Sequence, residues 1–182
     1  MEYHLNIPIT TEEIKRLHVG DIIYVSGKVF TARDEAHKKI LEKDKDGLLF
    51  NPSEMVLFHC GPLMKKEKGI WRVVSAGPTT SSRMELFEDE FIEKFGINLI
   101  IGKGGMGERT EKALQKYGGA YASYTGGAGA LAADEVEDVE AVYWLDELGM
   151  PEAVWIFKVK EFGPMVVAMD SHGKSIYRKM RK

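Results

Sequence analysis

The chain has 182 residues, of which 44% are hydrophobic, and its formal net charge is −3. This length fills one hydrophobic core, so we expect a single domain over residues 1–182. The weak negative charge offers no basic field for nucleic acid or for an anionic membrane. No apolar run reaches the roughly 20 residues that span a bilayer, and the polar N-terminus does not resemble a signal peptide. We therefore expect a cytoplasmic protein.

Capping patterns and short apolar runs alternate in the first 45 residues. They predict, in chain order, a helix over 11–17, strands over 22–25 and 28–31 joined by a hairpin turn at 26–27, and a helix that reaches toward residue 43. Thr10 and Glu13 have the spacing of a capping box, as do Thr31 and Asp34. Arg33 is therefore expected in a first helical turn.

Apolar runs and glycines in the rest of the chain predict a mixed sheet. The expected strands are 55–59, 71–76, 97–101, 120–124, 141–144, 153–159 and 165–169, with a solvated turn at 65–69. Two helices are expected, one capped by Ser82 and Glu85 and ended by Gly96, the other over 108–117 and ended by Gly118. Because helices and strands alternate up to residue 124, the predicted fold class is α/β, with a mixed central sheet flanked by helices.

The segment 77–83 crowds four hydroxyls and a guanidinium into a strand-to-helix turn. The hydroxyls belong to Thr79, Thr80, Ser81 and Ser82, and the guanidinium to Arg83. Unpaired amides and the positive end of a helix dipole favour an anion there, and a guanidinium can grip a carboxylate at two points. Hydroxyl residues are also common helix caps, so local spacing leaves both interpretations open.

The glycine-rich segment 102–107 formally matches the dinucleotide pattern G-x-G-x-x-G. A dinucleotide site also needs an acidic residue about 20 positions later, where this chain has the segment 124–127 without one. A P-loop is excluded because Lys103 is not followed by Ser or Thr. Lys103, between Gly102 and Gly104, is therefore expected on an amide-lined loop that suits a second small anion, or on a tight turn with an exposed lysine.

Three further features bear on chemistry. Arg33, Asp34 and His37 share a helix start, where Asp34 and His37 either orient the Arg33 guanidinium or lie on a solvated face. The five histidines show no metal-binding spacing, so no metal site is predicted. Cys60 is the one cysteine, and a lone thiol cannot hold an iron-sulfur cluster. It follows an apolar strand, which favours a buried packing role over that of a nucleophile.

Taken in order, these motifs resemble the β subunit of class I fumarases and L-tartrate dehydratases. The matching segments are 19–21, 32–37, 60–62, 77–84, 102–105, 148–152 and 161–164, which together span nearly the whole chain. The resemblance implies a single swivelling β/β/α-type domain. It also implies an α subunit that carries a [4Fe-4S] cluster on three cysteines, in a hetero-oligomer such as α2β2. Cys60 departs from the family, in which a small residue such as alanine is usual there.

The resemblance also implies roles for individual residues. Arg33, Arg83 and Lys103 are expected to bind the dicarboxylate, and Thr79 to remove the carbon-bound proton. The supporting residues expected around them are Asp34, His37, Thr80, Ser81, Gly102 and Gly104. The first hypothesis is reversible hydration of fumarate to (S)-malate, and the second is dehydration of L(+)-tartrate to oxaloacetate. A third, of another class, is a non-catalytic dicarboxylate-binding module.

Overall fold

The structure is a computed structural model that describes residues 1–124 and 129–178. Its strands are β1 (Glu2–Asn6), β2 (Ile22–Thr31), β3 (Val56–Phe58), β4 (Leu63–Glu67), β5 (Ile70–Ser75), β6 (Leu99–Gly102), β7 (Ala120–Tyr124), β8 (Val136–Tyr143) and β9 (Val154–Met169). Its helices are α1 (Thr11–Lys15), α2 (Asp34–Leu41), α3 (Glu85–Phe95), α4 (Glu108–Tyr117), α5 (Gly129–Asp134) and α6 (Leu145–Leu148), with 3-10 turns η1 (Lys45–Gly47), η2 (Pro52–Glu54) and η3 (Ser81–Met84). None of the helices in the described ranges has both the length and the apolar character needed to cross a membrane. The predicted domain boundaries, 1–182, extend past these ranges and stay a prediction.

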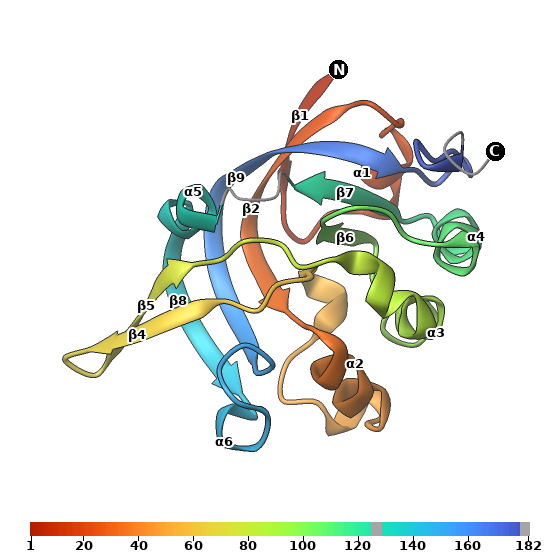
Figure 1. The fold of residues 1–182 in the computed structure, drawn as a ribbon. Coiled ribbons are helices and arrows are strands. Elements are labelled where there is room, and N and C mark those ends of the chain that lie inside the picture. The colour runs from red at the N-terminus through yellow and green to blue at the C-terminus, as the bar shows by residue number, and fades with distance from the viewer. Residues whose placement is uncertain (125–128, 179–182) are drawn as a thin grey trace.

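Seven strands form one mixed sheet in the order β1-β2-β3-β6-β7-β9-β8. The neighbours from β1 to β7 run parallel, whereas β9 is antiparallel to both β7 and β8. Strand β9 also pairs with β2, so the sheet curls and is partly barrel-like. Helices α2, α3 and α4 lie together on one side of it (Figure 1). This arrangement confirms the predicted fold class, and the swivelling motion stays a prediction.

Strands β3 and β6, in the middle of the parallel part of the sheet, are buried on both faces. Val56 and Phe58 of β3 belong to a cluster inside the curled sheet, while Leu57 belongs to a second cluster packed against the helices. Strand β6 repeats the pattern, with Leu99 inside and Ile100 toward the helices. Strands covered on both faces are continuous apolar runs, which explains why these short segments were recognisable in the sequence.

The predicted hairpin turn at 26–27 is wrong, because β2 continues through it. Strand β1 pairs with the first half of β2 and β3 with the second half, while β9 runs along both. The chain bends at Gly27, which has a φ of +129° and lies in an irregular stretch of the β2–β9 ladder. A Cβ there would lie 2.8 Å from Ile7 Cβ, so the bend requires glycine. The two strands predicted over 153–159 and 165–169 are likewise one strand, β9, which passes from β8 to β7.

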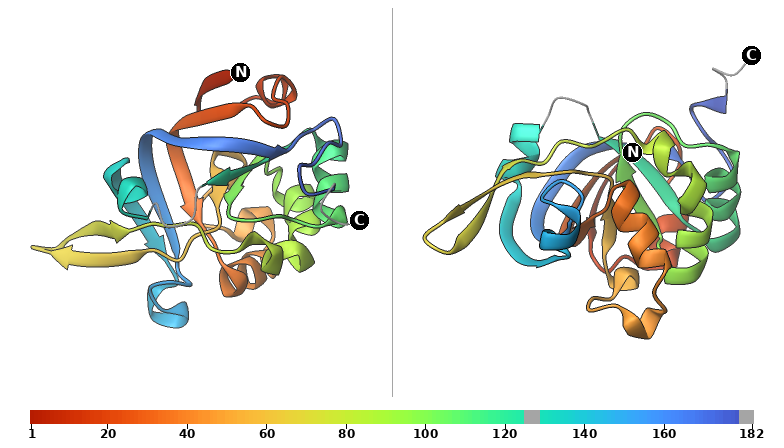
Figure 2. Two further views of the ribbon diagram at one scale, coloured as in Figure 1. Left: turned by 45° about the horizontal axis from the view of Figure 1, so that its top comes forward. Right: turned by 60° about the horizontal axis from the view of Figure 1, so that its bottom comes forward.

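Strands β4 and β5 form a separate hairpin that projects from the body of the protein (Figures 1 and 2). The predicted turn over 65–69 is shorter than expected, because 63–67 pair with β5. The predicted strand at 71–76 is present as β5, but its side chains are exposed or half-buried instead of fully buried. Trp71 anchors the hairpin by packing edge-on against Trp155, with 5.1 Å between ring centroids.

Side-chain caps follow the sequence prediction at only one of three helix starts. Thr10 and Glu13 form the predicted capping box on α1. Thr31 instead ends β2, where its hydroxyl accepts a backbone amide of β9 at 3.0 Å. Ser82 caps no helix with its side chain, and Glu85 accepts amides at the start of α4, at 2.6 and 3.0 Å. Side chains that local spacing assigns to helix caps thus form hydrogen bonds with distant segments instead.

Candidate anion-binding site

The carboxyl ends of three parallel strands meet at one edge of the sheet. Strand β2 leads to Arg33, β3 to His59 and β6 to Lys103. Open α/β sheets bind ligands at this edge, because the chain leaves each strand there in a loop. The segment after β5 reaches the same place, since the Thr79 amide donates to the His59 carbonyl at 2.8 Å. We call this edge, with Arg33, residues 79–83 and Lys103, the rim.

Arg33 is held at the rim by Glu152 and not by His37. It occupies the N-cap position of α2 with an extended backbone. Its Nε lies 3.2 Å from Glu152 Oε1, and the other oxygen of Glu152 accepts the Glu35 amide at 3.1 Å. The Arg33 side chain crosses Gly61, where a Cβ would lie 2.6 Å from Arg33 Cδ. These contacts hold the Arg33 side chain at the rim, where 28% of it stays exposed, although Nε makes no hydrogen bond within the described residues.

Thr79 and Arg83 contact each other at the rim. Arg83 Nη2 donates to Thr79 Oγ1 at 2.9 Å, and Arg83 Nε lies 3.4 Å from Asp34 Oδ2. Thr79 is half-buried, and Arg83 is exposed. A guanidinium that donates to a hydroxyl favours negative charge on that oxygen. Asp34 therefore orients Arg83, whereas the sequence analysis placed it either beside the Arg33 guanidinium or on a solvated face.

Ser81 and Lys103 link the two loops of the rim. The Lys103 amide donates to Ser81 Oγ at 3.2 Å, and the Ser81 amide donates to the Lys103 carbonyl at 3.0 Å. Thr80 is exposed but forms a backbone bridge with Lys103. The Gly104 carbonyl accepts the Tyr177 hydroxyl, which fixes the glycine loop. Lys103 is half-buried, and its backbone, not its ammonium, makes the contacts with Ser81.

Gly102 marks the closest approach of the two loops. A Cβ at this position would lie 1.8 Å from Ser81 Oγ and 3.0 Å from both His59 Nδ1 and Tyr121 Oη. We expect Gly102→Ala to lower the free energy of unfolding by about 3 kcal/mol, because the methyl group displaces a buried, hydrogen-bonded hydroxyl. Urea unfolding measures this as a lower midpoint at unchanged slope. Gly47→Ala is the control, since its Cβ meets only ordinary contacts from 3.8 Å. Equal midpoints for the two variants would contradict the expected clash.

A buried carboxylate, Glu88, lies beneath the rim between two histidines. His59 Nε2 is 2.9 Å and His37 Nε2 is 3.3 Å from Glu88 Oε2, and all three side chains are fully buried. Burial raises the pKa of Glu88, but the two imidazoles outweigh it and hold this pKa at about 2. Burial lowers the pKa of His37, yet Glu88 shifts it upward overall; for His59, burial prevails and lowers the pKa. The structure thus supports neither role predicted for His37, since its ring is buried and contacts the Arg33 carbonyl, not the Arg33 guanidinium.

Glu88, His37 and His59 also form the group of described side chains that could hold a metal ion, with ligand atoms within 4.8 Å of one another. The sequence predicts no metal here, because these residues are far apart along the chain. Hydrogen bonds already occupy all four ring nitrogens, since His37 Nδ1 meets a carbonyl at 2.7 Å and His59 Nδ1 a hydroxyl at 2.8 Å.

Cys60 is fully buried, and burial raises the pKa of its thiol. Such a thiol is neither a nucleophile nor a ligand for a solvent-facing cluster. In the native chain at pH 8, we expect it to react with a thiol reagent about a hundredfold more slowly than in the unfolded chain, because reaction requires opening of the core. The rate in guanidinium chloride is the reference. Equal rates in the two states would show that Cys60 is accessible.

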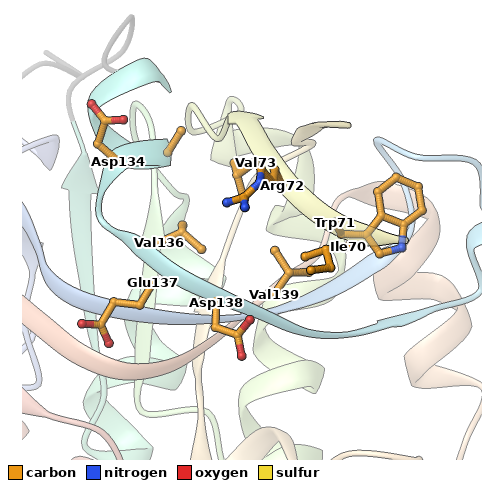
Figure 3. Close-up of a pocket in the computed structure, with 10 residues that line it drawn as sticks. Ile70, Trp71, Arg72, Val73, Asp134, Val136, Glu137, Asp138 and Val139 are labelled. Carbon is orange, nitrogen blue, oxygen red and sulfur yellow. The ribbon is translucent and has the colours of Figure 1, made fainter. Parts of the chain in front are cut away.

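A pocket of about 290 Å³ lies away from the rim, between β5 and β8 (Figure 3). Trp71 and Val73 line one side of it, and Val136 and Val139 line the other. None of its lining residues is a predicted site residue. The charged residues around it carry both signs, so it does not select an anion.

Sequence reasoning missed three residues that shape the site: Glu88, His59 and Glu152. Glu88 left a visible signal, because it occupies a position within the apolar stripe of α3, between buried Met84 and Phe91. A charged residue inside such a stripe is buried only when it is paired.

The amino-acid sequence is similar to known proteins over nearly its whole length. A family model described as the fumarase C-terminus matches residues 1–180. The putative L(+)-tartrate dehydratase subunit beta of Methanocaldococcus jannaschii is 51% identical, with 100% of this chain and 94% of that protein covered. The L(+)-tartrate dehydratase subunit beta of Escherichia coli (strain K12) is 43% identical, with 100% and 90% covered. The putative fumarate hydratase class I of Geobacillus stearothermophilus is 45% identical, with 98% of this chain and 34% of that longer protein covered.

The curled sheet and its rim define an α/β domain that concentrates cations and hydroxyls at the ends of parallel strands. The relatives named above are called dehydratases or a hydratase, and these are hydro-lyases. The chain belongs to the fumarase C-terminal family, as the resemblance of its motifs predicted.

Proposed function

We propose that the chain is the β subunit of a [4Fe-4S] hydro-lyase that reversibly hydrates fumarate to (S)-malate. The observation that carries this proposal is the gathering of three cations and one hydroxyl at the rim: Arg33, Arg83, Lys103 and Thr79. A four-carbon dicarboxylate presents two anionic groups, and three cations from three loops suit both. Family membership supports the hydro-lyase class.

Within this proposal Thr79 is the base that takes the carbon-bound proton of malate. A threonine hydroxyl is a weak base in water, so its surroundings must favour the alkoxide. The Arg83 guanidinium donates to Thr79 Oγ1 at 2.9 Å, and the Lys103 ammonium lies on the adjoining loop. In the reverse direction the same hydroxyl returns a proton to the carbon.

The cluster belongs to a partner in this proposal. Cys60 is the one cysteine of the sequence and is buried, so these 182 residues do not supply the thiolates that hold a cluster. When bound on an α subunit, the cluster supplies a Lewis-acidic iron for the departing hydroxyl. Two relatives are named as beta subunits, which supports an α-type partner and a hetero-oligomer such as α2β2.

L(+)-tartrate is the second candidate substrate, and the names of the relatives favour it. Both beta-subunit relatives carry a tartrate dehydratase name, while a third relative carries a fumarate hydratase name at 45% identity. Tartrate and malate present the same two carboxylates to the three cations, so the charges at the rim suit both.

Anaerobic capture of partners with this chain as bait tests the proposal. The eluate is assayed for malate-to-fumarate and tartrate-to-oxaloacetate conversion. Oxygen-sensitive activity with a cysteine-bearing partner is the expected result, and the preferred substrate decides between the two candidates. Tight fumarate binding by the isolated chain, with no partner and no turnover, would instead favour a non-catalytic dicarboxylate-binding module.

A further inference from the structure

A chain of buried hydrogen bonds runs beneath the rim, and its first half joins Glu88 to helix α2. His37 Nε2 faces the Glu88 carboxylate at 3.3 Å, and His37 Nδ1 lies 2.7 Å from the Arg33 carbonyl oxygen. A carbonyl and a carboxylate only accept, so both ring nitrogens of His37 carry protons. The titratable groups that face this ring are Glu88, His59 and Asp34. His37 is thus an imidazolium that fixes the backbone of Arg33 at the helix start.

The second half of the chain joins Glu88 to the two loops of the rim. His59 Nε2 donates to Glu88 Oε2 at 2.9 Å, and His59 Nδ1 accepts the Ser81 hydroxyl at 2.8 Å. Ser81 Oγ in turn accepts the Lys103 amide at 3.2 Å and the Tyr121 hydroxyl at 3.0 Å. This arrangement uses the one proton and both lone pairs of the Ser81 hydroxyl. His59 is neutral in it, because Nδ1 carries no proton.

We propose that this buried chain sets the spacing of the rim cations, through four positioning residues that do not touch substrate: His37, His59, Ser81 and Glu88. Glu88 is the hub, because one carboxylate holds both histidines. The inference deepens the proposed function and rests on it for the role of the rim. Through Glu88, the backbones of Arg33 and Lys103 are tied to the segment that carries Thr79 and Arg83.

Burial strengthens the links of this hydrogen-bond chain. His37, His59, Ser81 and Glu88 have no exposed surface, and Phe91 packs on His37 with 4.7 Å between ring centroids. Hydrogen bonds shielded from water are stronger, and an unpaired member is costly, so each link constrains the next. A displacement of about 1 Å at a reacting group can cost about a hundredfold in rate. Loss of one of these hydrogen bonds should therefore change the amide exchange of rim residues and the reaction rate.

The first test is NMR spectroscopy of the full-length polypeptide labelled with ¹⁵N. We expect the His37 ring to show two protonated nitrogens at pH 7.5, and the His59 ring to show protonated Nε2 with unprotonated Nδ1. The Lys103 amide should be protected against hydrogen exchange. Metal analysis of the same sample should find no stoichiometric transition metal. A bound metal, or the other tautomer of His59, would overturn the inference.

The second test cuts one link in two ways. Ser81→Ala removes the hydroxyl, and His59→Gln keeps a donor for Glu88 but offers nothing at the Nδ1 position. Each variant should speed exchange of the Lys103 amide about tenfold and lower kcat/KM of the assembled complex about 10- to 100-fold. Because both variants break the same link, the double variant should be no worse than the poorer single one. Fully additive losses of kcat/KM in the double variant would contradict the inference that Ser81 and His59 act through one connected series of hydrogen bonds.

Thr110→Val is the matched control for the removal of a buried hydroxyl. Thr110 is fully buried and donates to Glu85 at 2.6 Å, outside the chain of bonds. It should lower the unfolding midpoint but leave both Lys103 exchange and kcat/KM near the wild-type values. Equal effects from Thr110→Val and Ser81→Ala would overturn the positioning role. A wild-type complex inactive on both dicarboxylates would contradict the proposed function alone, since exchange and the histidine resonances would still decide the inference.

Discussion

Replacement of Thr79 by valine should lower kcat of the assembled complex by at least about 10³-fold, while substrate binding changes only a few-fold. Valine has nearly the shape of threonine but no oxygen to take the carbon-bound proton. Under the proposed function the three cations still bind the carboxylates in this variant, so the loss should appear in kcat and not in KM. Steady-state kinetics in both reaction directions measure it, because the same hydroxyl serves both.

Ser82→Ala is the control for Thr79→Val. Ser82 is exposed in the same turn and caps no helix with its side chain. It should keep near wild-type kcat, and both variants should retain partner binding and cluster content. Substantial turnover by Thr79→Val would assign the base to another group.

Arg83→Ala should lower kcat/KM by about 10²- to 10³-fold, equivalent to roughly 3–4 kcal/mol of transition-state stabilisation. The guanidinium contacts Thr79 Oγ1 and lies beside Asp34. Under the proposed function, its removal takes away a carboxylate anchor and the donor that favours the alkoxide. Arg83→Lys should restore only part of the loss, because an ammonium cannot make the two-point contact. Initial rates at several substrate concentrations separate the two effects.

Arg109→Ala is the matched control for Arg83→Ala. Arg109 makes a two-point ion pair with Asp89 at 2.9 and 3.0 Å and is similarly exposed, but it lies on α4 and is not one of the rim residues. Its loss should leave kcat/KM near the wild-type value. Comparable losses in the two variants would show that the effect of Arg83 is not specific to the rim.

The sequence predicted the elements whose signals are local. Strands β3, β6 and β7 were visible as apolar runs, whereas the polar strand β1 was not predicted. Gly96 and Gly118 end α3 and α4 as predicted, each in a left-handed conformation. The hairpin at 26–27 was mispredicted because the choice between turning and continuing depends on strands β1, β3 and β9, which no local pattern reveals. Thr31 and Glu85 were assigned to the wrong caps for the same reason.

In the candidate site, too, some residues were predictable from local signals and others were not. Arg33, Thr79, Arg83 and Lys103 stand at strand ends or helix starts, where parallel strands gather at one edge, so topology alone brings them to the rim. The partners beneath them come from distant segments: Glu88 is 51 residues from His37 and 29 from His59. Glu152 is more than 100 residues from Arg33, which explains why the sequence paired Arg33 with its neighbours instead.

The pairing of β2 with β9 has a consequence for how the protein is made. Ile22 lies opposite Val166, so the longest ladder in the fold joins residues far apart in the chain. Such non-local contacts form slowly, and on a ribosome they cannot form until β9 has emerged. Strand β2 therefore waits without one of its partners until the ribosome has synthesised β9. Any partner subunit that recognises the completed sheet must then bind after β9 has emerged.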